Sequence, residues 1–273
     1  MLNIGILTNQ DDLHALVVKH ELDAFGDVNC RIVETDVISG TPSCNWREGG
    51  SKDGRSGVFD RDGNPLDPRS LDVIWWRRVN SPQIVPNGLY DEVQRDLIDQ
   101  DCRSTLLGLF MNEFHGTWIN EPSATRLAEN KLIQLKAARA TGLDIPDTLV
   151  SQDPAEIRLF VKEHKGNVVI KPVQGTRLRP LFTRKLRTEH LESDVSLMAS
   201  PAIYQEYIEG SKHLRIHCFG DRFFTASIET SDLDWRENLN VPFNKIDLDE
   251  KTESHITDLL QRLGLKMGVM TVS

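Results

Sequence analysis

A chain of 273 residues is long enough for two or three lobes, and its 39% hydrophobic and 27% charged residues are ordinary for a globular protein. The formal net charge of −9 excludes a generally basic surface, so we expect binding neither to nucleic acid nor to an anionic membrane, although a local basic pocket is compatible with it. No apolar run reaches the roughly 18 residues of a membrane span, and MLNIGILTNQDD lacks the features of a signal peptide, so we expect a cytoplasmic protein.

The N-terminal segment predicts a β-α-β unit. LNIGILT reads as a strand, Asp11 and Asp12 as caps of a helix to about Phe25, and CRIVETDVI as a second strand. This order favours a parallel sheet, and no GxGxxG motif marks a dinucleotide site. The side chains expected on the inner face of the helix are Leu13, Leu16, Val17 and Phe25.

Residues 40–70 are rich in turn-forming residues, and the Asp-Gly pair in FDRDGNPL predicts a hairpin. LDVIWWRRV predicts a strand, followed by a helix from about Leu89 to Glu113. The pairs Trp75-Trp76 and Arg77-Arg78 favour a packing or interface cluster over a substrate contact. The apolar stripe of the helix is expected at Val93, Leu97, Ile98, Cys102, Leu106 and Leu109.

The next segment predicts a strand at TWINEP, then one helix capped by Ser123 and running to Ala140, with Gly142 at its end. DIPDTLVS predicts a strand, and Asp153-Pro154 begins a helix that ends near Gly166. Further strands are expected at VVIK, LFTRKL and AIYQEYI. HLRIHCF and RFFTASIE predict a hairpin, which a helix over about 250–263 and a strand at LKMGVMTV follow.

The cysteines are scattered through the chain and form no CxxC pair. They are Cys30, Cys44, Cys102 and Cys218. This spacing favours buried or idle thiols in a reducing compartment.

VVIKPVQG, residues 168–175, brings Lys171 to a strand end and follows it with a glycine loop. The backbone N–H groups of Gln174, Gly175 and Thr176 could face the anionic oxygens of a polyphosphate, since glycine removes the side-chain obstacle. Lys171 would add a compact positive charge. Taken alone, the motif favours the alternative of a lysine that extends from a strand end to solvent.

Two neighbouring features favour the nucleotide interpretation. Lys131 could bring a second positive charge, although a solvated helix lysine is the alternative. In YQEYIEG, the backbone of Gln205, Glu206, Tyr207 and Ile208 could hold the edge of a nucleobase. His213 and His217 share a strand face, but no third ligand is evident, so ordinary histidines are favoured over a metal pair.

The order of three segments resembles the ATP-grasp ligases. They are NEPSATRLAENKLIQLKAARATGLDIPDTLVS, VVIKPVQGTR and IYQEYIEGSKHLRIHCFGDRFFTASIE, and they cover about 120–230. WWRRV and SDLDWREN are similar to segments of the microviridin or graspetide ligases, which mature ribosomal peptides. The resemblance implies an α/β (α+β) ATP-grasp fold with a pre-ATP-grasp domain at 1–120, a central lobe at 121–200 and a C-terminal lobe at 201–273.

The resemblance also implies roles for individual residues. Lys131 and Lys171 would contact the α- and β-phosphates, and the loop from Gln174 to Arg179 would cover the triphosphate. Residues 205–208 would form the adenine hinge, and His213 falls near the ribose, where an acid is common. Arg215 would be catalytic, close to the γ-phosphate. Asp234, Trp235 and Arg236 would face the substrate, together with Arg184 unless that residue is merely solvated.

The implied cofactors are ATP and Mg²⁺. The implied reaction activates a carboxylate as an acyl phosphate, which an amine or hydroxyl then attacks. A ribosomal precursor peptide is the expected partner, with self-association into a homodimer left open. The alternatives are a non-catalytic binding protein and a small-molecule ligase resembling glutathione synthase.

The resemblance stops at LGLKMGVMTVS. ATP-grasp enzymes carry a metal-binding aspartate on this strand and Glu-x-Asn on the next, but the aspartate position corresponds to Thr271 and no Glu-x-Asn strand follows. We therefore expect no metal ligands in this chain and a shortened C-terminal lobe. A shortened chain, a natural truncation and a homologue that has lost catalysis all fit this pattern, and an altered metal site at Glu206, Glu229 and Asp234 is not favoured.

Overall fold

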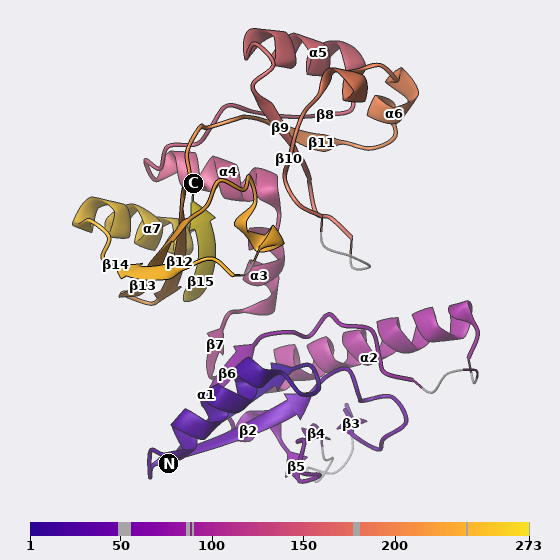
Figure 1. The fold of residues 1–273 in the computed structure, drawn as a ribbon. Coiled ribbons are helices and arrows are strands. Elements are labelled where there is room, and N and C mark those ends of the chain that lie inside the picture. The colour runs from indigo at the N-terminus through magenta and orange to yellow at the C-terminus, as the bar shows by residue number, and fades with distance from the viewer. Residues whose placement is uncertain (49–55, 86–87, 89, 177–180, 239, 273) are drawn as a thin grey trace. The chain divides into compact units, whose positions relative to one another are not determined.

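The structure is a computed structural model that describes residues 1–273 except 49–55, 86–87, 89, 177–180, 239 and 273. The chain divides into two compact units, Met1–Pro122 and Ser123–Ser273 (Figure 1). Each unit builds its own sheets and cores. In the part of the chain that the structure describes, no helix has the length and apolar character that crossing a membrane requires.

The first unit is built on the parallel sheet that its β-α-β start predicts. The strand order is β2-β1-β6-β7, and each neighbouring pair is parallel. The strands are β1 Leu2–Thr8, β2 Val28–Glu34, β6 Val73–Trp76 and β7 Thr117–Ile119. A separate sheet of short antiparallel strands contains β3 Cys44–Asn45, β4 Gly57–Phe59 and β5 Pro65–Leu66. Gly63, in the predicted Asp-Gly turn between β4 and β5, has a φ of +78° that favours glycine.

Helix α1, Leu13–Asp23, buries a different face from the one predicted. Leu13, Val17 and Phe25 are exposed, whereas Ala15 is buried and Val18, Leu22 and Leu16 pack beside it. The N-cap fixes the rotation of the helix, because the Asp12 carboxylate accepts hydrogen bonds from the Thr8 hydroxyl and the Arg77 guanidinium, both at 2.6 Å. Only Leu16 of the predicted inner face is correct.

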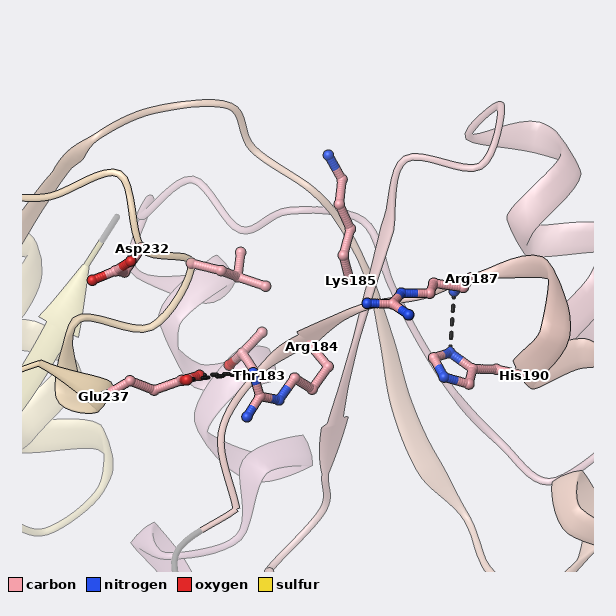
Figure 2. Close-up of a pocket in the computed structure, with 8 residues that line it drawn as sticks. Thr183, Arg184, Lys185, Arg187, His190, Asp232 and Glu237 are labelled. Carbon is pink, nitrogen blue, oxygen red and sulfur yellow. Dashed lines mark hydrogen bonds and ion pairs between the residues drawn. The ribbon is translucent and has the colours of Figure 1, made fainter.

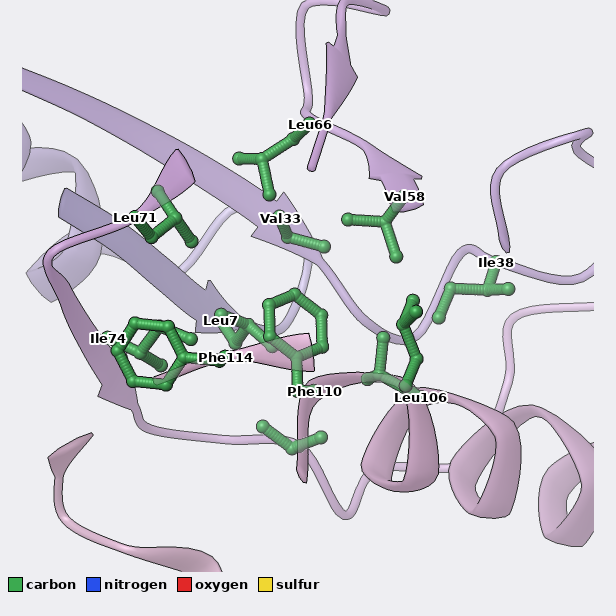
Figure 3. Close-up of a cluster of buried hydrophobic side chains, with 12 residues drawn as sticks. Leu7, Val33, Ile38, Val58, Leu66, Leu71, Ile74, Leu106, Phe110 and Phe114 are labelled. Carbon is green, nitrogen blue, oxygen red and sulfur yellow. The ribbon is translucent and has the colours of Figure 1, made fainter. Parts of the chain in front are cut away.

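Helix α2, Glu92–Glu113, packs on the sheet through its C-terminal half only. Val93 and Leu97 are therefore exposed, contrary to the prediction, while Leu106, Leu109 and Phe110 are buried. The same core contains the side chains of Leu7, Val33 and Ile74 from the sheet (Figure 3). The predicted start at Leu89 lies outside the described residues.

The aromatic and arginine cluster after β6 is used for packing inside the first unit. Trp76 contacts Phe110 and Trp118 edge-on, with ring centroids 6.1 and 5.6 Å apart. The Arg77 guanidinium lies 4.9 Å from the centroid of Trp75. These contacts confirm the packing interpretation of the cluster.

In the second unit, two helices replace the single helix predicted to run from Ser123 to Ala140. They are α3, Pro122–Ala128, and α4, Lys131–Ala140. The break occurs because the side-chain oxygen of Asn130 accepts hydrogen bonds from the amides of Leu132 and Ile133, at 3.0 and 3.3 Å. Asn130 is therefore the N-cap of a new helix, and Lys131 is its first residue. Gly142, with a φ of +85°, follows the end of α4 as predicted.

The first sheet of the second unit is antiparallel, in the order β10-β9-β11-β8. The strands are β8 Thr148–Ser151, β9 Val168–Pro172, β10 Arg184–Lys185 and β11 Ala202–Glu206, so LFTRKL forms a much shorter strand than predicted. Helices α5, Pro154–Glu163, and α6, Asp194–Met198, pack on one face through a core that includes Ile157, Leu197 and Tyr204. The opposite face carries Lys171 and Gln205.

The second sheet of this unit has the order β14-β13-β12-β15 and is antiparallel. Its strands are β12 Lys212–Phe219, β13 Arg222–Glu229, β14 Phe243–Ile246 and β15 Met267–Val272. Helix α7, Glu250–Arg262, covers one face, where Ile216 and Cys218 meet Ile256 and Leu260. Because side chains alternate along a strand, His213, Arg215 and His217 lie on the other face.

All four cysteines are free, as the spacing predicts. Burial raises the pKa of Cys30 and of Cys44 to about 11, which keeps both thiols protonated and unreactive at neutral pH.

Candidate functional site

Four cationic side chains of the second unit lie close enough to perturb one another. Burial, Lys131 and Arg236 together lower the pKa of Lys171. Burial and Arg236 lower the pKa of Lys131 and also that of Arg215. The Asp234 carboxylate acts in the opposite direction and raises the pKa of Lys171. We call Lys131, Lys171, Arg215 and Arg236 the cationic cluster.

Lys131 owes its position to the break between α3 and α4. As the first residue of α4 it follows the Asn130 cap directly, and its ammonium group donates to the Gln134 side chain at 3.0 Å. The residue keeps solvent-accessible surface, yet its surroundings are crowded enough that loss of hydration lowers the pKa of its ammonium group.

Lys171 is near the end of β9, on the face opposite α5. Its ammonium group donates to the side-chain oxygen of Gln205 on the adjacent strand β11, at 2.5 Å. Gln205 is only 7% exposed, and its amide nitrogen donates to the Thr148 hydroxyl at 2.8 Å. Lys171 is therefore held by a buried neutral group.

The glycine loop after Lys171 is described as far as Thr176. Gln174, Gly175 and Thr176 are exposed, and Gly175 has a φ of +85°, a conformation that disfavours any other residue. The remainder of the predicted phosphate loop, residues 177–179, lies outside the described residues.

The backbone after β11 has a restricted hydrogen-bonding capacity. The amides of Glu206 and Tyr207 donate to the carbonyls of Asp147 and Asn167, both at 2.9 Å. Any base held by the segment 205–208 would therefore use its carbonyl groups or the Ile208 amide. The Lys185 ammonium lies 4.2 Å from the ring centroid of Tyr207, so the Lys185 side chain packs on this segment.

Arg215 is held on the open face of the second sheet. Its guanidinium donates to the Thr271 hydroxyl at 2.9 Å, and Thr271 is its direct partner on β15. Burial and the charge of Arg215 lower the pKa of His217, two residues along the same face. His213, predicted near the ribose, is buried at 5% exposure on this face.

The segment Asp234-Trp235-Arg236 folds as a short 3-10 turn capped by Asp234. The buried Asp234 carboxylate accepts hydrogen bonds from Arg236 Nε at 2.7 Å and from the Thr183 amide at 3.2 Å. Burial alone would raise the pKa of Asp234, but the hydrogen bonds from Arg236 and Thr183 outweigh it and lower the value. Trp235 packs edge-on against Phe243, with centroids 5.8 Å apart.

A cavity of about 520 Å³ opens between this segment and the strand β10 region. Figure 2 shows Arg184 pointing at Glu237, and their ion pair measures 3.1 Å. Cations and anions both line the cavity, so its walls suit a polar, charged ligand more than an apolar one. The lining residues are Thr183, Arg184, Lys185, Arg187, His190, Asp232, Leu233 and Glu237.

The described residues do not provide an evident metal site. Within them, no group of three or more His, Cys, Asp or Glu is arranged to hold a metal ion. Of the carboxylates considered from the sequence, Asp234 is occupied by Arg236 and the Thr183 amide. The ligands that Mg²⁺ prefers, carboxylate oxygens, are therefore not gathered here.

Sequence reasoning missed three contributors to this region: Asn130, Thr148 and Thr183. The Asn in AENK was a readable cap signal, since asparagine before a helical run is typical of an N-cap. Thr148 and Thr183 join the site only through strand pairing and loop packing, for which the sequence carries no local signal.

Comparison with known proteins supports this picture of the fold. No family model and no curated protein sequence matches the chain. The macrocyclase MdnC of Microcystis aeruginosa, solved with the precursor peptide MdnA, is similar with 25% identity and a TM-score of 0.87 over 99% of this chain and 86% of that chain.

Two further structures extend the comparison. A RiPP-associated ATP-grasp ligase of Chryseobacterium gregarium, solved with ADP and a leader and core peptide, has 24% identity and a TM-score of 0.82, over 99% of this chain and 84% of that chain. The D-alanine–D-alanine ligase of Bacillus anthracis is more distant, with 13% identity and a TM-score of 0.55 over 99% of this chain and 82% of that chain. The α/β ATP-grasp fold expected from the sequence is thus confirmed, and within that fold the chain is similar in structure to RiPP-associated ATP-grasp ligases.

Proposed function

We propose that this protein is an ATP-dependent ligase that activates a carboxylate of a ribosomal precursor peptide for amide or ester formation. The observation that carries the proposal is the cationic cluster. Arg236 lowers the pKa of Lys131, Lys171 and Arg215, Lys131 also lowers that of Lys171, and Asp234 acts in the opposite direction on Lys171. Lysines whose pKa is lowered in this way favour a ligand that brings negative charge.

A nucleoside triphosphate matches the cluster in charge. Lys131 and Lys171 would contact the α- and β-phosphates, and the exposed backbone of Gln174, Gly175 and Thr176 would lie beside them. Carbonyl groups of 205–207 and the Ile208 amide would meet the base, with His213 near the ribose. Arg215 would lie at the γ-phosphate, where a planar guanidinium suits phosphoryl oxygens.

The peptide would enter through the cavity beside Arg184. Asp234 fixes Arg236 and the Thr183 amide, and the residues on either side of the Asp234–Arg236 segment, Leu233 and Glu237, line the cavity. The similar macrocyclase and the Chryseobacterium ligase were solved with a precursor peptide and with leader and core peptides. A mixed-charge cavity of this size suits an acidic side chain and its flanking backbone.

The proposed chemistry has two steps. A carboxylate oxygen attacks the γ-phosphorus, the bond to the β–γ bridging oxygen breaks, and ADP leaves with that electron pair. An amine nitrogen or hydroxyl oxygen then attacks the acyl carbon, loses its proton to solvent, and expels inorganic phosphate with the carbon–oxygen bond electrons. The side chains contribute positioning and charge compensation, chiefly through Lys171 and Arg215.

Mg²⁺ normally compensates phosphate charge in such reactions. Because the described residues form no carboxylate set for it, no step is assigned to a protein-bound metal. The same observation favours a second candidate function, a non-catalytic homologue that binds nucleotide or peptide without turnover.

Turnover of ATP separates the two candidate functions, the ligase and the non-catalytic binding protein. We expect ADP to stabilise the protein against thermal unfolding, and ATP with MgCl2 and an acidic peptide to yield ADP and a peptide lighter by one water. Hydroxylamine added to the mixture should trap the acyl phosphate as a hydroxamate. Stabilisation without ADP release would support the binding protein, and the absence of both effects would refute nucleotide use altogether.

A further inference from the structure

A directed chain of hydrogen bonds lies behind Lys171. The ammonium group donates to Gln205 Oε1 at 2.5 Å, Gln205 Nε2 donates to Thr148 Oγ1 at 2.8 Å, and the Thr148 hydroxyl donates to the Pro146 carbonyl at 2.8 Å. Gln205 is 7% exposed, so water competes little for its amide. The chain crosses β9, β11 and β8, which are hydrogen-bonded neighbours.

The chemistry of the groups fixes the orientation of the chain. An ammonium group only donates, so Gln205 must turn its oxygen toward Lys171 and its nitrogen toward Thr148. The Thr148 hydroxyl accepts from that nitrogen, which leaves its own hydrogen for the Pro146 carbonyl. Each link of the chain therefore joins one donor to one acceptor, and flipping the Gln205 amide would break two of the three bonds.

We propose that Gln205 is a positioning residue that fixes the ammonium group of Lys171 while leaving its charge uncancelled, and that Thr148 holds Gln205 in the required orientation. A glutamate at the same place would accept the same hydrogen bond but neutralise the lysine. A neutral amide anchors the cation and leaves its full charge for an anionic ligand. The identity of that ligand as a nucleotide rests on the proposed function.

This inference assigns the side chain of Gln205 to Lys171 instead of to a nucleobase. Thr148 and Lys171 lie on the same face of the sheet as Gln205, because Gln205 pairs with Thr148 and its neighbour two residues away, Ile203, pairs with Lys171. The Gln205 side chain thus lies between Lys171 and Thr148, and its oxygen and nitrogen are both engaged in hydrogen bonds with these two residues.

A double-mutant cycle with ADP as the probe tests the assignment. Lys171→Ala is expected to weaken ADP binding by more than about tenfold, the size of one lost charge-assisted contact, and Gln205→Leu by about tenfold. In the Lys171→Ala background, Gln205→Leu should add less than twofold, because its only effect passes through Lys171. Gln205→Glu should also weaken binding despite keeping an acceptor, whereas a purely structural role would let it bind normally.

Two further variants keep the test decisive. Gln261→Leu on α7, at an exposed position, is the matched control and should leave ADP binding unchanged. If Gln205→Leu does not fold, Thr148→Val replaces it in the cycle and is expected to show the same dependence on Lys171.

The outcomes distinguish this inference from the proposed function. Additive effects of Gln205→Leu and Lys171→Ala, or normal ADP binding by Gln205→Glu, would overturn the role of Gln205 alone. Absence of ADP binding by the unaltered protein would overturn the proposed function and this inference with it.

Discussion

Arg215 on β12 and Thr271 on β15 are direct partners in an antiparallel pair, and the guanidinium donates to the threonine hydroxyl at 2.9 Å. The contact matters because the family resemblance implies a metal-binding aspartate at the position that Thr271 occupies in this chain. A carboxylate would pair with Arg215 and reduce its charge, whereas a hydroxyl orients the guanidinium and leaves the charge intact. Thr271 therefore gives Arg215 a neutral hydrogen-bond acceptor, the role that we propose for Gln205 toward Lys171.

Thr271→Val preserves the shape of the side chain and removes the acceptor. We expect ADP release in the presence of peptide to slow by about tenfold or more, the size of one lost hydrogen bond to a charged group. The measurement is steady-state ADP production. Thr257→Val on α7 is the matched control, since the Thr257 hydroxyl bonds only to its own helix at the Glu253 carbonyl and its loss should leave the rate unchanged. An unaltered rate in Thr271→Val would show that Arg215 needs no such support.

Lys171→Ala should weaken nucleotide binding by about 1.5–3 kcal/mol, the usual size for a lost charge-assisted contact. The free energy of unfolding of the ligand-free protein should fall much less, because removing Lys171 also relieves repulsion from Lys131 and Arg236. Calorimetric titration with ADP and chemical denaturation measure the two quantities. Lys251→Ala, on the exposed side of α7, is the control. Equal losses of affinity in both variants would exclude a specific role for Lys171.

At alkaline pH, the affinity for ADP should fall while the contribution of Lys171 to the free energy of unfolding rises. The pKa of Lys171 is lowered from its ordinary value of 10.5, so in the pH interval between the lowered value and 10.5 the folded protein binds fewer protons than the unfolded chain. The contribution of Lys171 to the free energy of unfolding therefore rises with pH across that interval. Affinity for ADP should fall over the same interval, because the ammonium charge is lost.

Lys171→Arg provides the control for this pH dependence, since a guanidinium stays charged throughout the interval. We expect ADP affinity in that variant to be flatter with pH, measured by titration at several pH values. If the unaltered protein and Lys171→Arg lose affinity in parallel, the titrating group is not Lys171.

Most strands and the ATP-grasp fold could be predicted from the sequence. The strands depend on local residue patterns, and the fold was inferred from the order of the segments along the chain. VVIK and the hairpin at 212–229 are strands in the structure, AIYQEYI is a strand only as far as Glu206, and the ATP-grasp fold is confirmed. The roles of individual site residues stay predictions. Even so, the structure brings Lys131 and Lys171 within electrostatic reach of each other, from segments that are distant in sequence.

The buried faces of α1 and α2 were harder to predict. Helical spacing identified apolar positions, but which stripe meets the sheet depends on how the helix is rotated and how far it overlaps the strands. Asp12 sets that rotation for α1 through Thr8 and Arg77, contacts that span the fold. Pairwise contacts such as Gln205 with Thr148 depend on strand register in the same way, so a pattern within one segment does not reveal them.

Asn130→Ala tests the N-cap of α4, which a local sequence signal marks but the prediction of a single helix from Ser123 to Ala140 overlooked. Loss of the N-cap should lower the free energy of unfolding by about 1 kcal/mol, because the amides of Leu132 and Ile133 lose their acceptor. It should also weaken ADP binding, since Lys131 is the first residue after the cap and its orientation depends on where α4 begins. Asn130→Asp, which keeps the cap, should restore stability, and Asn167→Ala at an exposed loop position is the control for the substitution itself. Unchanged stability in Asn130→Ala would mean that α3 and α4 are separated by packing and not by the asparagine side chain.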